Sequence, residues 1–413
     1  MKIENKNNLS LSSKLTSGKD GGLRIYFIVG EPSGDILSSR LMRAIAAMHP
    51  QTFFFGIGGE TMTAAGFHSL FNIKDLSVMG AVEVIPKLPV ILNRRKQILA
   101  DIEKVQPDVI VTVDSWGFIN SILKKLKRKK CTIPKVHYVA PQVWAWKKGR
   151  AKKAAKLIEH LMTLLPYEPS FFEKYGLDCT FVGHPVIENT ADLPKDISLL
   201  RTKFEISANA RILCVLPGSR HSEVKRLAPV FIESVKQLQN NISNLFLLIP
   251  SVENLKDEIN DYFKNINIPY KIILGQQARY EAFCVSEFAI AASGTVSLEL
   301  AACHTPHLIA YSFNPLTNAI VEFFAVTKYA NLINVLADNF IIPEFVLRNC
   351  KAALIVPEAL SFFENKQKCG TQILQASEQL AKLHPADTLP SQKAAEVVID
   401  AAGKVGLQRK SNF

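Results

Sequence analysis

Short apolar runs recur along almost the whole chain, each ending at a turn with glycine or proline and followed by a helical pattern. Runs of this length are typical of strands buried on both faces of a parallel sheet. In the first half they occupy 23–29, 53–57, 109–113, 135–139 and 161–165. In the second half they occupy 211–216, 245–250, 270–274, 288–292 and 306–311. Strands alternating with helices predict an α/β fold of two doubly wound, Rossmann-like parallel-sheet domains that face a cleft.

Breaks in this pattern predict the domain boundaries. Residues 1–22 are polar and lack the apolar core of a signal peptide, so we expect a disordered extension. The first domain is predicted over 23–190 and the second over 205–356, joined by a polar, broken linker within 183–204. Helices are expected over 357–405, and whether they pack back on the first domain is left open. No run reaches the roughly 18 apolar residues that a transmembrane helix needs.

Composition narrows the class of protein. With 413 residues, 48% of them apolar and 21% charged, the chain is globular and long enough for two domains. Its seven cysteines are scattered and never spaced as C-x-x-C, which favours free thiols in a cytosolic protein. A D-x-D motif and His/Cys/carboxylate spacings suited to a metal are also missing. The sequence therefore predicts no metal and no cofactor.

Positive charge is concentrated in one segment. The net charge is +12, and thirteen Lys and Arg residues lie within 124–156, while no acidic residue occurs between Asp114 and Glu159. Such a segment attracts phosphates, whether of a substrate, an anionic bilayer or a nucleic acid. An ordinary solvated face is the alternative.

The strand at 288–292 runs into a turn that is suited to a phosphate. A helix is expected to begin just after it, and the first backbone N–H groups of a helix lack helical acceptors and carry partial positive charge. Glu299 lies about one helical turn further on, where its carboxylate could accept hydrogen bonds from a ribose diol. The turn consists of Ser293, Gly294 and Thr295. This stretch indicates a nucleotide, unless it is a plain strand–helix joint.

A second turn of this kind follows the strand at 211–216. It contains Gly218, Ser219 and Arg220, and the guanidinium of Arg220 could hold a diphosphate through two hydrogen bonds. The first domain has a comparable glycine turn at 30–35, and Asp114 ends the strand at 109–113, at the sheet edge where ligands bind.

The segment 79–96 joins an apolar loop to a basic helix. Apolar residues followed at once by basic ones suit a surface that enters the headgroup region of a membrane. An ordinary amphipathic helix with two prolines near its start is the alternative. The residues expected at the membrane or at acyl chains are Met79, Val82, Val84, Ile85, Leu88, Ile91, Arg94 and Arg95.

Six motifs together resemble those of the lipid-A-disaccharide synthase family, over about 24–356. They are Gly30-Glu31-Pro32-Ser33-Gly34-Asp35, Leu76-Ser77-Val78-Met79-Gly80 with Glu83-Val84, Pro141-Gln142-Val143-Trp144-Ala145-Trp146, Gly183-His184-Pro185, Leu216-Pro217-Gly218-Ser219-Arg220 with Glu223, and Ala292-Ser293-Gly294-Thr295 with Glu299.

The resemblance implies a metal-independent, inverting GT-B glycosyltransferase, a hexosyltransferase of lipid A and lipopolysaccharide biosynthesis. It would transfer 2,3-diacylglucosamine from its UDP form to 2,3-diacylglucosamine 1-phosphate, giving a β-1,6 disaccharide and UDP. The second domain would hold UDP and the first the acylated sugars. The protein would be cytoplasmic and peripheral on the cytoplasmic face of the inner membrane, with no nucleic-acid partner and with a homo-oligomer left open.

The resemblance also assigns roles to single residues. Asp114 matches the general base, and Glu31 and Ser33 would line the reaction centre. The UDP leaving charge would be met by Arg220 and the 293–295 turn. Asn334 matches an active-site Asn of the family, and His184 lies at the domain junction.

Three positions depart from the family pattern. After Asp114 the family commonly has x-Pro-Asp-Phe-Asn, but Gly117 stands where the second carboxylate is usual. Ser312 replaces a frequent basic residue, and Ile333 a usual proline. Two alternatives to the assignment remain. One is another GT-B UDP-sugar transferase or a sugar-nucleotide epimerase, and the other is a non-enzymatic module that binds polyanions or membranes.

Overall fold

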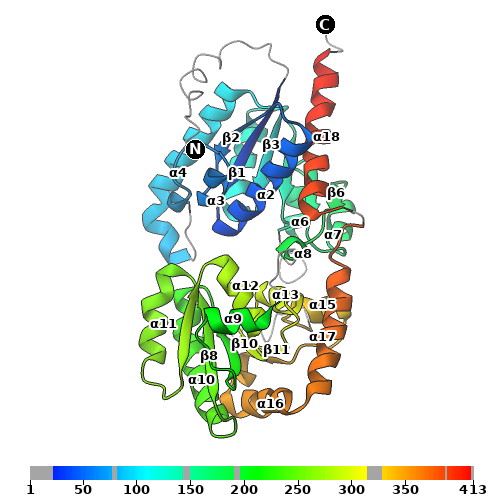
Figure 1. The fold of residues 1–413 in the computed structure, drawn as a ribbon. Helices are drawn as coiled ribbons and strands as arrows, with labels where there is room; N and C mark the ends of the chain where they lie inside the picture. The colour runs from blue at the N-terminus through cyan, green and yellow to red at the C-terminus, as the bar shows by residue number, and fades with distance from the viewer. Residues whose placement is uncertain are drawn as a thin grey trace, which may run out of the picture.

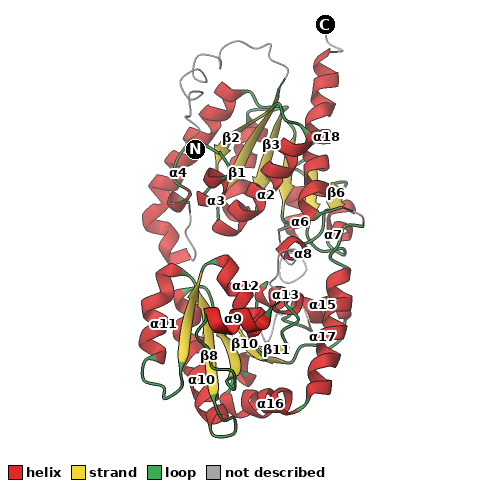
Figure 2. Cartoon of the chain, viewed as in Figure 1, coloured by secondary structure: helices red, strands yellow, loops and turns green. Residues whose placement is uncertain are grey.

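The computed structural model describes residues 22–76, 81–141, 143, 149–189, 196–313, 328–386 and 388–410. Its strands form two six-stranded parallel sheets, one in each of two stacked lobes, and helices flank the sheets (Figures 1 and 2). The predicted α/β class with two doubly wound domains is confirmed. The extension expected over 1–22 lies outside the described residues, except for Gly22.

In the first lobe, the sheet has the order β2-β1-β3-β4-β5-β6. Its strands are β1 (Leu23–Val29), β2 (Thr52–Ile57), β3 (Val109–Val113), β4 (Lys135–Tyr138), β5 (His160–Thr163) and β6 (Asp178–Phe181). Its helices are α2 (Pro32–Met48), α3 (Glu60–Ala64), α4 (Ala81–Val105), α5 (Trp116–Arg128), α6 (Gly149–Ala154) and α7 (Pro169–Glu173). Two short helices follow towards the second lobe, α8 (Val186–Asn189) and α9 (Ile197–Lys203).

The sheet of the second lobe has the order β12-β11-β10-β7-β8-β9. Its strands are β7 (Arg211–Leu216), β8 (Leu245–Ser251), β9 (Tyr270–Leu274), β10 (Phe288–Ala291), β11 (His307–Tyr311) and β12 (Glu344–Val346). Its helices are α10 (His221–Gln239), α11 (Lys256–Phe263), α12 (Gln276–Val285), α13 (Val296–Ala302) and α15 (Leu332–Ala337). The chain ends with α16 (Ala352–Glu364), α17 (Lys366–Ala381) and α18 (Pro390–Lys410).

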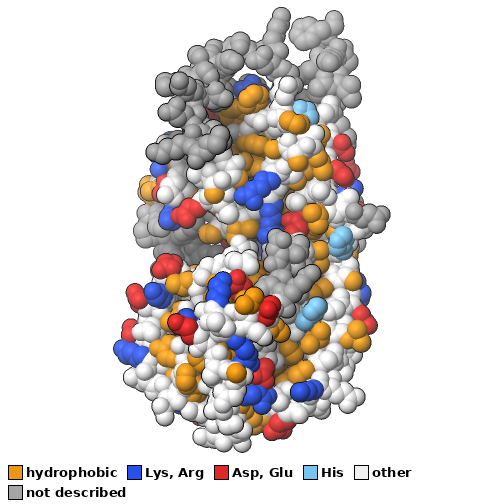
Figure 3. Space-filling view, in the orientation of Figure 1, with side chains coloured by type: hydrophobic (Ala, Val, Ile, Leu, Met, Phe, Trp, Pro, Cys, Tyr) orange, Lys and Arg blue, Asp and Glu red, His pale blue; other side chains and the backbone are white. Residues whose placement is uncertain are grey.

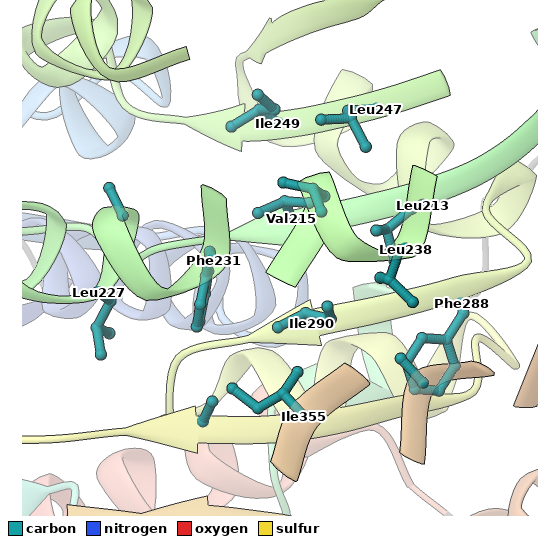
Figure 4. Packing of buried hydrophobic residues seen from close by; sticks show 14 of the residues in the cluster. Leu213, Val215, Leu227, Phe231, Leu238, Leu247, Ile249, Phe288, Ile290 and Ile355 are labelled. Carbon is teal, nitrogen blue, oxygen red and sulfur yellow. The ribbon is translucent and has the colours of Figure 1, made fainter. Parts of the chain in front are cut away.

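Apolar side chains of strands and helices interlock in each lobe. In the second lobe, Leu213 and Ile290 of the sheet pack with Phe231 of α10 and Ile355 of α16, all fully buried (Figure 4). Phe288 stacks on Phe362 of α16 with ring centroids 4.8 Å apart. Burying a large apolar side chain contributes about 1.5–3 kcal/mol, so this cluster fixes the sheet that carries the turns.

The last helices divide between the lobes. α16 packs on α10 and α17 on α13, so both belong with the second lobe. α18 lies against α2, and its buried Ala395 and Val398 join the apolar cluster of the first lobe. The chain therefore returns to the first lobe at its end, beside α2 in Figure 1.

Two segments differ from what the sequence predicts. The apolar part of 79–96 is helical from Ala81, not a loop: α4 includes Pro86 and Pro89. Both prolines lie beyond the first turn, so each removes one backbone hydrogen bond, and the helix nevertheless continues to Val105. Within the predicted linker, α8 and α9 are helical, and buried Leu200 of α9 packs in the second lobe.

On the described part of the chain, none of the helices combines the length and the apolar character that a membrane crossing requires.

Candidate active site

Both sheets change the direction of their strand order at the turns that the sequence singles out. In the first lobe the order reverses between β1 and β3, which are hydrogen-bonded neighbours with Val29 opposite Val113. In the second lobe it reverses between β7 and β10, with Leu216 opposite Ala291. Ligands of doubly wound sheets bind at such a switch point, outside the carboxyl ends of the strands. Each lobe thus contributes one pair of adjacent turns.

In the first lobe, Asp114 follows β3 in an unusual backbone conformation. Asp114 and Ser115 both have positive φ, 51° and 41°. Left-handed residues other than glycine cost on the order of 1–2 kcal/mol each, and such strain is found at functional sites. The amide of Asp114 donates to Tyr138 O at 2.9 Å. The hydroxyl of Ser33 donates to the carboxylate of Asp114 at 3.2 Å, which joins the two turns.

Glu31 is the second carboxylate of this edge. The hydroxyl of Ser115 donates to Glu31 Oε1 at 2.9 Å. Gly30 makes this contact possible, because a Cβ there would lie only 2.6 Å from the Ser115 hydroxyl. Burial, and then the charge of Asp114, raise the pKa of Glu31, whereas Ser115 and Arg220 lower it. Arg220 belongs to the other lobe, so the charges that act on Glu31 come from both lobes.

The turn after β7 differs in detail from the expectation. The amide of Ser219 is not free for a ligand, because it donates to Glu223 Oε2 at 3.0 Å. Arg220 pairs with the other oxygen of Glu223 at 3.0 Å, and its side chain is 53% exposed. Tyr311 at the end of β11 also donates to Glu223, at 3.2 Å. Buried Glu223 therefore holds the turn while the guanidinium of Arg220 stays accessible to an anion.

The neighbouring turn after β10 is more open. Gly294 and Thr295 are exposed, and nothing lies within 4 Å of the place where a Cβ of Gly294 would be. The hydroxyl of Ser293 donates to Ala330 O at 3.0 Å. α13 begins at Val296, so the first helical amides lie next to this open space. An anionic group could approach the main chain here without a clash.

Glu299 is held by an arginine of α12. Arg279 donates to Glu299 Oε1 at 2.9 Å, and the Glu299 side chain is 14% exposed. Burial raises the pKa of Glu299, while the charge of Arg279 and a hydrogen bond with Tyr280 oppose that rise. The carboxylate of Glu299 is thereby held in a fixed orientation, about one helical turn beyond the open segment 293–295.

Asn334 is not at the surface of this site. It is fully buried, and its amide nitrogen donates to Ile342 O and to Glu344 Oε1, both at 2.8 Å. Its oxygen accepts from the amides of Ile341 and Ile342 at 2.9 Å. All hydrogen-bonding capacity of the side chain is thereby used within the protein. In this structure Asn334 does not face the open turn with a free polar atom, although the resemblance matches it to an active-site Asn expected to bind the donor.

His184 lies where the chain passes between the lobes. Its backbone amide donates to Leu383 O at 3.0 Å, and its Nδ1 accepts from the Val186 amide at 3.2 Å. Burial lowers the pKa of His184 to about 4, so the ring is neutral at pH 7. These hydrogen bonds of His184 stabilise the segment that joins the two lobes.

The residues expected at a membrane, except Met79, belong to α4. Leu88 is 46% exposed, and Ile91 is half-buried. Arg94 is not a free cation, since it donates to Asp75 at 2.6 and 2.9 Å and covers the ring of Phe71. Met79 lies outside the described residues, and so do the side chains of Val82, Val84 and Ile85.

Arg95, also on α4, is half-buried.

Among the residues that the structure describes, no group of three or more His, Cys, Asp and Glu side chains could hold a metal ion.

Sequence patterns missed two residues that shape the site. Ser115 holds Glu31, and Arg279 holds Glu299. The bonded residues are 84 and 20 positions apart in the sequence, and no local spacing marks such pairs.

The chain is similar in sequence to one protein family and similar in fold to several solved structures. The family described as lipid-A-disaccharide synthetase matches residues 25–398. The lipid-A-disaccharide synthase of Paramagnetospirillum magneticum is 41% identical over 379 residues, which are 91% of this chain and 97% of that protein. Solved structures share the fold at low identity. UDP-GlcNAc 2-epimerase of Neisseria meningitidis bound to UDP-GlcNAc has a TM-score of 0.63 at 11% identity, with 92% of this chain and 100% of that chain covered. MurG of Acinetobacter baumannii has a TM-score of 0.52 at 12% identity, with 92% and 99% covered.

Proposed function

The chain belongs to the lipid-A-disaccharide synthase family, and from that premise we propose how its two facing edges perform the reaction of the family. It is a GT-B glycosyltransferase of lipid A biosynthesis that uses a UDP-sugar. It transfers 2,3-diacylglucosamine from the UDP derivative to the 6-hydroxyl of 2,3-diacylglucosamine 1-phosphate. The products are UDP and a β-1,6-linked disaccharide 1-phosphate.

One observation supports the division of labour between the lobes. The carboxylates of Asp114 and Glu31 stand at the switch point of the first lobe, close enough to Arg220 of the second that its charge lowers the pKa of Glu31. A base on one side and a cation on the other are what an inverting transfer needs, because a proton leaves the acceptor as negative charge grows on the diphosphate.

Each residue then has a role. Asp114 takes the proton of the acceptor hydroxyl as it attacks the anomeric carbon, and Ser33 orients its carboxylate. Glu31 lies beside this reaction centre. Arg220 and the open turn at 293–295 stabilise the departing UDP, and Glu299 binds the ribose hydroxyls. Asn334 acts indirectly, by holding the segment 341–344.

The first lobe approaches the lipid. Leu88 and Val90 expose 46% and 45% of their surface on α4, and α4 packs beside α5, where Lys124, Lys127 and Arg128 are exposed. Exposed apolar side chains near the start of α4 and exposed basic side chains near the end of α5 belong to the same lobe, and such a combination suits peripheral binding to an anionic membrane surface. On the face drawn in Figure 3, by contrast, acidic, basic and apolar side chains are interspersed over the lower lobe. We place the protein on the cytoplasmic face of the inner membrane.

The test is product analysis with both acylated substrates. We expect UDP and disaccharide in equal amounts, and neither product when the acceptor is omitted. A matched reaction contains water-soluble UDP-GlcNAc alone. Epimerised sugar in that reaction, with no disaccharide from the acylated pair, would overturn the proposal in favour of an epimerase.

A further inference from the structure

Arg226 is a second arginine at the carboxyl edge of the second sheet. It lies on α10, three residues after Glu223, and residues three apart share one face of a helix. Its Nη1 donates to Ser312 O at 2.8 Å. Ser312 directly follows Tyr311, the last residue of β11, whose hydroxyl donates to Glu223 at 3.2 Å. The guanidinium of Arg226 therefore lies where β11 ends, on the side of the sheet that Glu223 supports.

This edge is the one that carries the open turn. β11 pairs with β10 in parallel, with Ile309 opposite Ala291. Both strands end within two residues of that pair, at Tyr311 and at Ala291 itself. The carboxyl ends of parallel strands lie on one side of the sheet, so Ser312 and the turn at 293–295 share this edge.

Most of the hydrogen-bonding capacity of Arg226 is not used within the protein. A guanidinium has five N–H donors. Within the described ranges, Ser312 O is the one acceptor of Arg226, and no carboxylate forms an ion pair with it. The side chain is half-buried. A guanidinium that is partly removed from water and lacks an anionic partner in the protein is suited to an anionic ligand.

The balance of charge at this edge points to the same ligand. Arg220 and Glu223 form an ion pair at 3.0 Å, so their charges offset each other. Arg226 adds a positive charge that no described residue neutralises in this way. Ser312 adds none, although the resemblance leads one to expect a basic residue at that position. Arg226 thus provides from α10 the charge that position 312 lacks.

We propose that Arg226 binds the diphosphate of the UDP-sugar, as a second guanidinium beside Arg220. This inference rests on the proposed function, in which the second lobe holds UDP. The hydrogen bond to Ser312 O orients the guanidinium, and its remaining N–H groups donate to phosphate oxygens. As the bond between the diphosphate and the sugar breaks, the two arginines share the charge that grows on UDP.

The test compares UDP with uridine, which lacks the phosphates, in calorimetric titrations of the full chain. Arg226→Gln keeps a side-chain N–H group for Ser312 O and removes the charge. We expect the UDP Kd to rise about tenfold while the uridine Kd stays within about twofold of wild type, because only UDP has phosphates to lose a contact. Arg226→Lys keeps the charge and should bind UDP more tightly than Arg226→Gln.

The matched control is Arg201→Gln in the same lobe. Arg201 also donates to backbone carbonyls, those of Ser207, Ala208 and Ala210. These residues precede β7, at the opposite edge of the sheet. Arg201→Gln should therefore leave the UDP Kd within about twofold of wild type.

Two results would overturn the inference. One is a UDP Kd of Arg226→Gln within about twofold of the Arg201→Gln control. The other is an equal rise of the UDP and uridine Kd in Arg226→Gln, which would mean that the substitution disturbs the site and not a contact with phosphate. If Arg226→Gln does not fold, Arg226→Met, which keeps the aliphatic stem, is titrated with both ligands and judged by the same two results.

The wild-type protein separates this inference from the function on which it rests. UDP that binds no more tightly than uridine to the wild type would contradict the donor site itself. UDP that binds more tightly than uridine to the wild type, together with an unchanged UDP Kd in Arg226→Gln, would reject only the role of Arg226.

Discussion

Gly218 is the position where one methyl group should have the largest effect on the donor site. Its φ is +120°, a conformation that side chains rarely adopt, and a Cβ there would lie 2.5 Å from Glu223 Cβ and 2.7 Å from Glu223 Oε2. The same carboxylate holds the Ser219 amide and Arg220. Gly218→Ala therefore strains the backbone and also pushes away the side chain that shapes the turn.

The cost can be estimated from these two effects. Backbone strain contributes about 1–3 kcal/mol and overpacking about 1–3 kcal/mol, so we expect a destabilisation of about 3 kcal/mol. For a lobe of this size, that lowers the midpoint of thermal unfolding by roughly 6–12 °C. The UDP Kd should also rise, because Arg220 loses its support.

Calorimetry on Gly218→Ala measures both quantities. The matched control is Gly370→Ala, at an exposed position inside α17 with nothing within 4 Å of the new methyl. Alanine is the better helix former there, so the control should gain about 0.5–1 kcal/mol. Equal behaviour of the two variants, or an unchanged midpoint in Gly218→Ala, would refute the reasoning.

Three further predictions concern stability and the membrane. Phe288→Ala removes a fully buried ring and should cost about 3–5 kcal/mol in denaturant unfolding; a loss under about 1 kcal/mol would contradict the packing described. Burial raises the pKa of Glu168 from 4.5 to about 7, so the stability due to its neutral form is complete below 4.5 and is lost as pH rises through 7. Glu168→Gln should gain up to about 3 kcal/mol relative to wild type between pH 4 and 8, and a constant difference would show that Glu168 does not titrate this way. Leu88→Glu with Val90→Glu should reduce sedimentation with anionic vesicles at unchanged UDP affinity; unchanged sedimentation would place the membrane surface elsewhere.

Much of the fold was predictable because buried parallel strands are nearly continuous apolar runs. Ten of the strands follow such runs. The strands β6 (Asp178–Phe181) and β12 (Glu344–Val346) are not predicted, since they are short edge strands with polar residues. The helical start of α4 was hidden by Pro86 and Pro89, which read as loop signals.

The turns of the site could be predicted from the sequence, but the residues that hold their side chains in place could not. Glycine turns after apolar runs mark three of the four edge segments and Asp114 after β3 marks the fourth, and the topology brings them together in pairs. The residues that fix them are distant in sequence: Ser115 bonds to Glu31 across 84 positions and Arg279 to Glu299 across 20. Asn334 was expected at the site, but its side chain is bonded within the protein, because a motif match does not tell whether a side chain faces a ligand or the protein.

The central claim is that the first lobe supplies the base and the second holds UDP. It is tested most directly by measuring turnover and the UDP Kd on one variant, Asp114→Asn. We predict that turnover falls about 10²–10⁴-fold while the UDP Kd stays within about twofold of wild type. Turnover near the wild-type rate, or a loss of UDP binding that accounts for the whole loss of activity, would contradict the account.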